Sequence, residues 1–231
     1  MKPMEKMTAR EVIVFCLMAI FAGIAVGIGG TASLISASRM GGGYGKILGG
    51  LLFSLGIYSI ISFEMKLFTG MVAAIPKMGV KNMWKLPVCF VCNALGVALV
   101  AVLLTFSPIY AEVKVEAVKL IGGKLHSDTW ALNALCSGAL CGILITMSIW
   151  ASHYAPAKGL STTVGVILPI VVFAFCGFDH SVANMMYFYF LGEVSWHVVG
   201  YILLSIVGNA IGGVLLPLVV MLRGTEKDKT V

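Results

Sequence analysis

FEMKLFTG at residues 63–70 and GFDHSVAN at residues 177–184 are two polar stretches that interrupt long apolar runs. The runs that contain them, residues 47–75 and 160–191, exceed the about 20 residues that one transmembrane helix needs. Inside a membrane, non-helical backbone is tolerated only where it is buried in protein or lines a cavity, because unpaired N–H and C=O groups are costly in lipid. The two stretches therefore predict two broken helices that line a pore.

The composition of the whole chain indicates an integral membrane protein. Of its 231 residues, 59% are hydrophobic and 11% are charged, and its mean hydropathy is +1.00. A soluble domain carries about 25% charged residues because its surface faces water. The chain is therefore predicted to be an all-α membrane protein embedded in a lipid bilayer, and soluble enzymes, nucleic-acid binders and disordered proteins are excluded.

Six apolar runs are long enough to cross a membrane as helices, and they fill a single domain of residues 1–231. We place them approximately at residues 11–36, 47–75, 86–107, 129–152, 160–191 and 196–222. Ten Lys and Arg residues lie on the side of both termini and five on the other side. Because positive charge is retained in the cytoplasm, both termini of this multi-pass protein are expected to be cytoplasmic. The outer connection, residues 108–128, is expected to form a solvated amphipathic helix.

The two halves of the chain share a short motif. NALG at residues 93–96, in the third predicted helix, matches NAIG at residues 209–212 in the sixth. Duplicated halves with three crossings each insert with opposite orientations. The expected fold is therefore two inverted three-helix repeats with the second and fifth helices broken. Asparagines 93, 184 and 209 are expected to bond the backbone groups that the breaks set free.

His180 is the one histidine within a predicted membrane span. An ionisable side chain is expensive to bury in a membrane and marks a functional site by default. The alternative is a neutral histidine bonded to a backbone carbonyl. His180 shares its break with Asp179, Ser181 and Asn184 and mirrors Thr69 in the other break, which favours a functional role.

The sequence has no pattern typical of a metal site, a cofactor site or an active site. Its six cysteines lie in apolar segments, where a thiol behaves as a small hydrophobe. The CFVC pair at residues 89–92 has no second pair that would complete a zinc site. No HExxH motif is present, and Glu64 and Asp179 lie on different helices. We expect neither a cofactor nor enzymatic activity.

Together these motifs resemble the formate/nitrite transporter family. The resemblance covers nearly the whole chain and rests on FEMKLFTG, on GFDHSVANM at residues 177–185 and on the NALG/NAIG pair. It implies an aquaporin-like fold and a homo-oligomer of five protomers, a pentamer. Each protomer would have its own pore for small monovalent anions such as formate, nitrite or hydrosulfide, across the cytoplasmic (cell inner) membrane.

The resemblance also implies roles for individual residues. His180 is then the central pore histidine and Thr69 its partner on the opposite broken helix, with Asn184 in the same site. Lys124 is similar to a vestibule lysine of the family. Two hydrophobic constrictions would be formed by Ile57, Leu67 and Phe68 on one side and by Phe53 and Phe173 on the other.

Lys66 departs from the family pattern, which usually has an acidic residue before LFTG. An ammonium at this place would add positive charge near the pore. It would favour hydrosulfide slightly over formate, because the parent acid of hydrosulfide is partly neutral near neutral pH. Alternatively, Lys66 extends toward an interface or pairs with Glu64, away from the pore.

An anion channel explains the pattern best, although other transporters share parts of it. A histidine between apolar gates can donate a hydrogen bond or a proton to the anion of a weak acid, which offsets the loss of hydration. A proton-coupled secondary transporter of the same anions would also use broken helices and an inverted repeat. A neutral-solute channel of the aquaporin type would need Asn-Pro-Ala motifs, which the sequence lacks.

Overall fold

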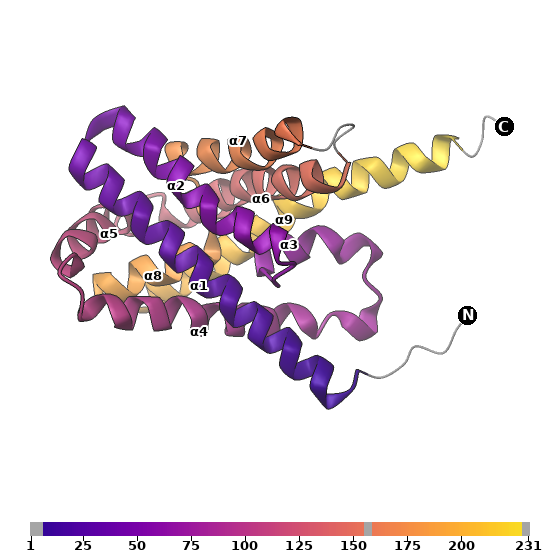
Figure 1. The fold of residues 1–231 in the computed structure, drawn as a ribbon, viewed down its shortest axis with the longest axis horizontal. Helices are drawn as coiled ribbons and strands as arrows, with labels where there is room; N and C mark the ends of the chain where they lie inside the picture. The colour runs from indigo at the N-terminus through magenta and orange to yellow at the C-terminus, as the bar shows by residue number, and fades with distance from the viewer. Residues whose placement is uncertain (1–6, 155–158, 228–231) are drawn as a thin grey trace.

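The computed structural model describes residues 7–154 and 159–227, and these residues form helices and short connections without a strand. The helices pack side by side in one bundle (Figure 1). In chain order they are α1 (Ala9–Met40), α2 (Gly42–Ser62), α3 (Phe68–Met71), the 3₁₀ helices η1 (Val72–Lys77) and η2 (Val80–Asn82), α4 (Lys85–Thr105), α5 (Tyr110–Leu125), α6 (Trp130–Tyr154), α7 (Leu160–Cys176), α8 (Ser181–Leu191) and α9 (Trp196–Lys227).

Among the described residues, six segments are long and apolar enough to cross a membrane. They correspond to the six predicted runs. The second differs from its prediction, because α2 begins at Gly42 and already ends at Ser62, and the short helices α3 and η1 complete the predicted run of residues 47–75. The fifth is broken between α7 and α8, as predicted. The N-terminal end of α1 and the C-terminal end of α9 lie at the same end of the bundle (Figure 1).

The NALG and NAIG motifs mark equivalent helix crossings in the two halves. A Cβ on Gly96 would collide with the carbonyl oxygen of Ile20 in α1, and a Cβ on Gly212 would collide with that of Ala139 in α6. Glycine therefore allows α4 to approach α1, and α9 to approach α6, more closely than any other residue would. The sequence repeat therefore corresponds to a repeat of helix packing, in which the pair of helices α1 and α4 matches the pair α6 and α9.

Helix α5 is amphipathic, as predicted, but its apolar face is not solvated. Four residues at helical spacing, Val113, Ala117, Ile121 and Leu125, are at most 1% exposed, and α5 packs mainly against α8. Arg39 at the end of α1 donates two hydrogen bonds of 3.1 Å to the carboxylate of Glu112, which holds the pKa of Glu112 below its ordinary value. Helix α5 is therefore part of the bundle and can present a side chain to its interior.

Candidate pore site

The two half-helices α3 and α8 begin in equivalent ways. The residues that precede them, Leu67 and His180, both have extended backbone, with φ of −104° and −90°. Each half-helix therefore points its N-terminal N–H groups and the positive end of its dipole to the middle of the protein. Leu67 thus occupies the position equivalent to His180. The sequence suggested Thr69 for this position, and the structure corrects that pairing.

Asn93 and Asn209 hold the two breaks with matching hydrogen bonds. The side-chain oxygen of Asn93 accepts the N–H of Phe68 at 2.8 Å, and its amide group donates to the carbonyls of Ala19 and Lys66. The side chain of Asn209 likewise accepts the N–H of Ser181 at 2.9 Å. Its amide donates at 2.8 Å to the carbonyls of Gly138 and Asp179. The predicted bonding to freed backbone groups is confirmed for Asn93 and Asn209, whereas the amide of Asn184 donates to the side chain of Asp179.

His180 and Thr69 meet at the centre of the protein. Both side chains are at most 1% exposed, and 3.0 Å separates His180 Nε2 from Thr69 Oγ1. The other ring nitrogen, Nδ1, accepts the N–H of Ala183 at 3.2 Å, so it carries no proton. The ring proton of His180 therefore resides on Nε2, which donates to Thr69, and the hydroxyl hydrogen of Thr69 is not used by this bond.

Two phenylalanines cover one side of the histidine. The rings of Phe173 and His180 stack with centroids 5.9 Å apart, and Phe53 meets Phe173 edge to face at 5.4 Å. These three side chains, together with Asn184 and Lys124, line a small cavity of about 50 Å³. Such a space holds little more than one or two water molecules. The structure thus brings five of the predicted site residues together around one narrow space.

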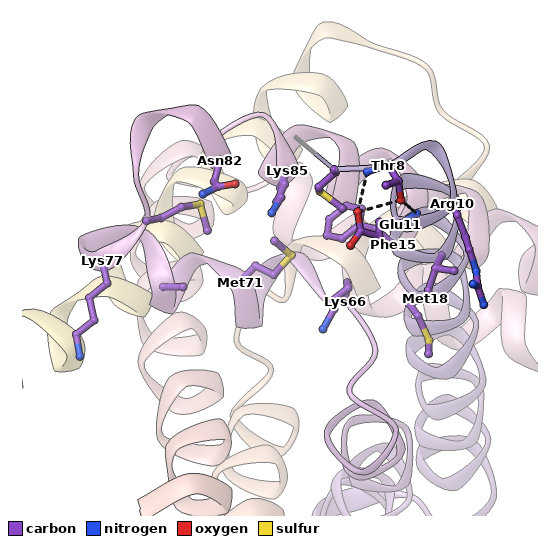
Figure 2. A pocket seen from close by; sticks show the side chains of 14 residues that line it. Thr8, Arg10, Glu11, Phe15, Met18, Lys66, Met71, Lys77, Asn82 and Lys85 are labelled. Atoms are coloured by element: carbon purple, nitrogen blue, oxygen red, sulfur yellow. Dashed lines mark hydrogen bonds between the residues drawn. The ribbon is translucent and has the colours of Figure 1, made fainter. Parts of the chain in front are cut away.

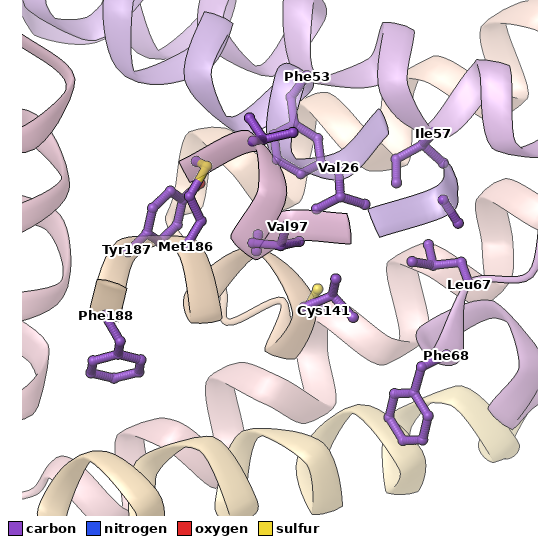
Figure 3. Close-up of a cluster of buried hydrophobic side chains, with 14 of the residues drawn as sticks. Val26, Phe53, Ile57, Leu67, Phe68, Val97, Cys141, Met186, Tyr187 and Phe188 are labelled. Atoms are coloured by element: carbon purple, nitrogen blue, oxygen red, sulfur yellow. The ribbon is translucent and has the colours of Figure 1, made fainter. Parts of the chain in front are cut away.

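Ile57 and Leu67 lie on the opposite side, at the inner end of a wider cavity of about 380 Å³ that we call the vestibule. Ile57 follows Phe53 by one turn of α2, and Figure 3 shows Leu67 facing Ile57. The sequence places Phe68 in this constriction as well, but its side chain points away from Ile57 and packs on Phe90 at 5.2 Å. Because Phe68 lines neither cavity, its contact with Phe90 gives it a packing role instead.

Asp179 is a buried carboxylate with a complete set of donors. Its Oδ1 accepts hydrogen bonds of 2.9 Å from Lys124 and Asn184, and its Oδ2 accepts one of 2.9 Å from Tyr201. The ammonium of Lys124 also donates to the carbonyl of Gly177, where α7 ends. Sequence reasoning included Lys124 and Asn184 but assigned no role to Tyr201, since a tyrosine in an apolar span gives no sign of its partner.

Lys66 lines the vestibule, together with Glu64, Met71 and His153. Its side chain is partly buried, and among the described residues it forms no ion pair with Glu64 or with any other carboxylate. Its backbone carbonyl accepts the bond from Asn93, which fixes the chain just before α3. The structure therefore places an ammonium without an ion-pair partner among the described residues in the same cavity as Ile57 and Leu67.

This arrangement of two capped half-helices around a histidine agrees with the comparison to known families. Residues 2–223 match the family described as Formate/nitrite transporter. The chain belongs to the formate/nitrite transporter family. The resemblance of the sequence motifs to this family is thereby confirmed, and the family consists of transporters and channels, not of enzymes.

Relatives of this family member come from bacteria and archaea. Formate channel FocB of Escherichia coli (strain K12) is 28% identical over 193 residues, which cover 78% of this chain and 67% of the relative. A probable formate transporter of Methanothermobacter thermautotrophicus is 27% identical over 246 residues, which cover 91% of this chain and 87% of the relative. The identities are similar although the two relatives come from distant organisms.

Two solved structures share the fold of this family member. A pentameric formate channel with formate bound superposes with a TM-score of 0.73 at 22% identity, and the match covers 95% of this chain and 99% of that chain. An ion channel of the same family superposes with a TM-score of 0.76, also at 22% identity, over 90% of this chain and 88% of that one. The predicted fold of inverted repeats with broken second and fifth helices is confirmed.

Proposed function

We propose that this protein is a channel for small monovalent anions of weak acids, namely formate, nitrite or hydrosulfide. The observation that carries this proposal is the His180–Thr69 contact between two apolar constrictions, Ile57–Leu67 and Phe53–Phe173. Support also comes from relatives that are named formate channels.

The physical reason lies in the cost of removing an anion from water. An unpaired charge in an apolar constriction costs far more than thermal energy, so rings of Leu, Ile and Phe alone would block it. The hydroxyl hydrogen of Thr69, which the contact with His180 leaves unused, is a donor at the point where hydration is lost, and the Nε2–H of His180 becomes a second donor when an anion replaces Thr69 as its acceptor. Hydrogen bonds from these groups offset part of the hydration that the anion loses in the constriction. A single donor pair also binds weakly enough for release.

Cationic side chains stand on both sides of this centre. Lys66 lines the vestibule, and Lys124 lines the small cavity beside Phe173. Lys124 uses two of its three N–H donors on Gly177 and Asp179, so one remains for an entering anion. Because its charge is offset by Asp179, Lys124 acts chiefly as a donor, whereas Lys66 contributes a net positive field.

The proposal includes the orientation of the chain in the membrane and its oligomeric state. Both termini are cytoplasmic, since Lys and Arg concentrate on their side of the chain. The vestibule with Lys66 then opens toward the cytoplasm. The protein forms a homo-oligomer, and the pentameric relative supports five protomers, each with its own pore.

Anion flux into proteoliposomes tests this function directly. The purified protein is reconstituted, and stopped-flow measurements compare formate, nitrite and hydrosulfide, with glycerol and water as controls. If the protein is a channel, at least one of the anions should flow down its own concentration gradient. Uptake that occurs only when a proton gradient is imposed would identify the proton-coupled transporter instead, and flux of glycerol or water alone would exclude an anion pathway.

Leu67→Ala is expected to weaken the size selectivity of the pore. Leu67 is 3% exposed and faces Ile57, so its truncation widens the constriction. An apolar site discriminates against a substrate with one extra methyl group by about tenfold or more. The acetate-to-formate flux ratio should therefore rise by about that factor. Leu55→Ala, on the exposed face of α2, is the matched control. A wild-type ratio in Leu67→Ala would show that Leu67 does not form the constriction.

Lys66→Glu is expected to slow the flux of every conducted anion, by about tenfold at low salt. The substitution reverses the charge of a vestibule side chain that has no ion-pair partner among the described residues. The effect should shrink as ionic strength rises, because salt screens an exposed charge. Lys81→Glu lies on the same side but lines neither pore cavity, and it should leave the flux nearly unchanged. Equal effects of the two variants would remove Lys66 from the pathway.

A further inference from the structure

A third cavity, larger than the vestibule, lies between the first turns of α1 and the segment that runs from α3 to the start of α4. Its volume is about 840 Å³, and we call it the α1–α4 cavity. Figure 2 shows Met71 and Lys85 on one side of the opening, Glu11 and Phe15 of α1 on the other, and Lys66 between them. Lys66 and Met71 line the vestibule as well, so the two cavities are neighbours.

Much of the wall of the α1–α4 cavity is apolar and adaptable. It includes the buried ring of Phe15 and four methionines, Met7, Met18, Met71 and Met78. Methionine is flexible and polarisable, and it conforms to irregular apolar partners. A wall of this kind suits a hydrocarbon chain, whereas a small inorganic anion gains nothing from it.

The rim of the α1–α4 cavity carries an excess of positive charge. Four cations, Arg10, Lys66, Lys77 and Lys85, face one carboxylate, Glu11, which leaves an excess of three. Glu11 is already engaged, because its Oε2 accepts hydrogen bonds of 2.7 and 3.0 Å from the backbone and hydroxyl of Thr8. Within residues 7–154 and 159–227, none of the four cations has an ion-pair partner.

The position of the α1–α4 cavity along the bundle is that of a membrane surface. Trp84, just before α4, is 39% exposed and packs its ring 6.2 Å from that of Phe15, which lines the cavity. Tryptophan is enriched where lipid headgroups meet water. The cavity therefore combines an apolar wall with cationic side chains beside a tryptophan of the kind found at membrane surfaces.

We propose that the α1–α4 cavity binds an anionic phospholipid, with its phosphate between Lys66 and Lys85 and an acyl chain along the methionines. Basic pockets between membrane helices attract anionic headgroups, and each nearby cation adds to the attraction. Because Lys66 belongs to both cavities, a bound phosphate lowers the positive potential of the vestibule. That consequence rests on the proposed function, but the binding itself does not.

Lipid titration of the purified full-length protein in mild detergent tests the site without any flux measurement. Phosphatidylglycerol and phosphatidylcholine with identical acyl chains are added in turn, and bound lipid is counted by native mass spectrometry. Phosphatidylglycerol should bind saturably and phosphatidylcholine should not. Lys85→Gln should weaken phosphatidylglycerol binding about fivefold, and Asn82→Lys, which adds a cation to the lining, should strengthen it about fivefold.

Lys81→Gln is the matched control, since this exposed lysine lies in η2 and does not line the cavity. Equal weakening by Lys81→Gln and Lys85→Gln would overturn the site in favour of general surface charge. Equal binding of the two lipids would overturn the recognition of phosphate charge. If millimolar inorganic phosphate displaced the lipid completely, the cavity would be a site for a soluble anion instead.

Discussion

His180→Asn is expected to reduce anion flux by about 10- to 150-fold, because a hydrogen bond to a charged group is worth about 1.5–3 kcal/mol. The shorter side chain cannot reach Thr69, so the histidine's share of the donor pair at the proposed pore centre is lost. Asparagine is a good N-cap and can still accept the N–H of Ala183 as His180 does. The helix α8, and with it the assembled protein, should therefore remain intact.

The measurement is flux in proteoliposomes at several pH values, with the elution profile of the oligomer as the test of folding. His197→Asn is the matched control, because His197 is exposed at the start of α9 and its ring lies beside Trp130, outside the pore cavities. Wild-type flux of His180→Asn at every pH would remove the histidine from the mechanism.

Asn209→Leu is expected to prevent assembly of a stable protein. Leucine has a similar size but leaves the N–H of Ser181 and the carbonyls of Asp179 and Gly138 without their present partner. A buried polar group that loses its partner costs about 1–3 kcal/mol. The carbonyl of Gly138 lies inside α6 and keeps its helical hydrogen bond, so the two remaining groups cost on the order of 2–6 kcal/mol. That amount is a large part of the stability of a typical domain.

Thermal unfolding and size-exclusion profiles of the detergent-solubilised protein measure this loss. Asn133→Leu serves as the control, since this exposed amide on α6 donates to a side-chain hydroxyl, that of Ser127. The equivalent variant Asn93→Leu should behave like Asn209→Leu, because Asn93 makes the matching bonds at the other break. Wild-type melting of Asn209→Leu would show that its amide does not hold the break.

The sequence by itself determined the membrane fold and the two breaks. Apolar runs of membrane length specify crossing helices through burial alone, and polar stretches such as residues 177–184 can stay in the membrane only within protein. The NALG/NAIG pair indicated the repeat, because each motif combines the asparagine that holds a break with the glycine of a helix crossing. Both signals are local, so they can be recognised before any tertiary contact is known.

The tertiary structure alone decided which side chains meet at the candidate pore site. The rotation of a helix about its own axis depends on its crossings with other helices, such as those at Gly96 and Gly212. For this reason Leu67 faces Ile57 while its neighbour Phe68 packs on Phe90. Lys124 reaches Asp179 because α5 buries its apolar face in the bundle. Such contacts join residues that are far apart in the chain, so the local periodicity of the sequence does not predict them.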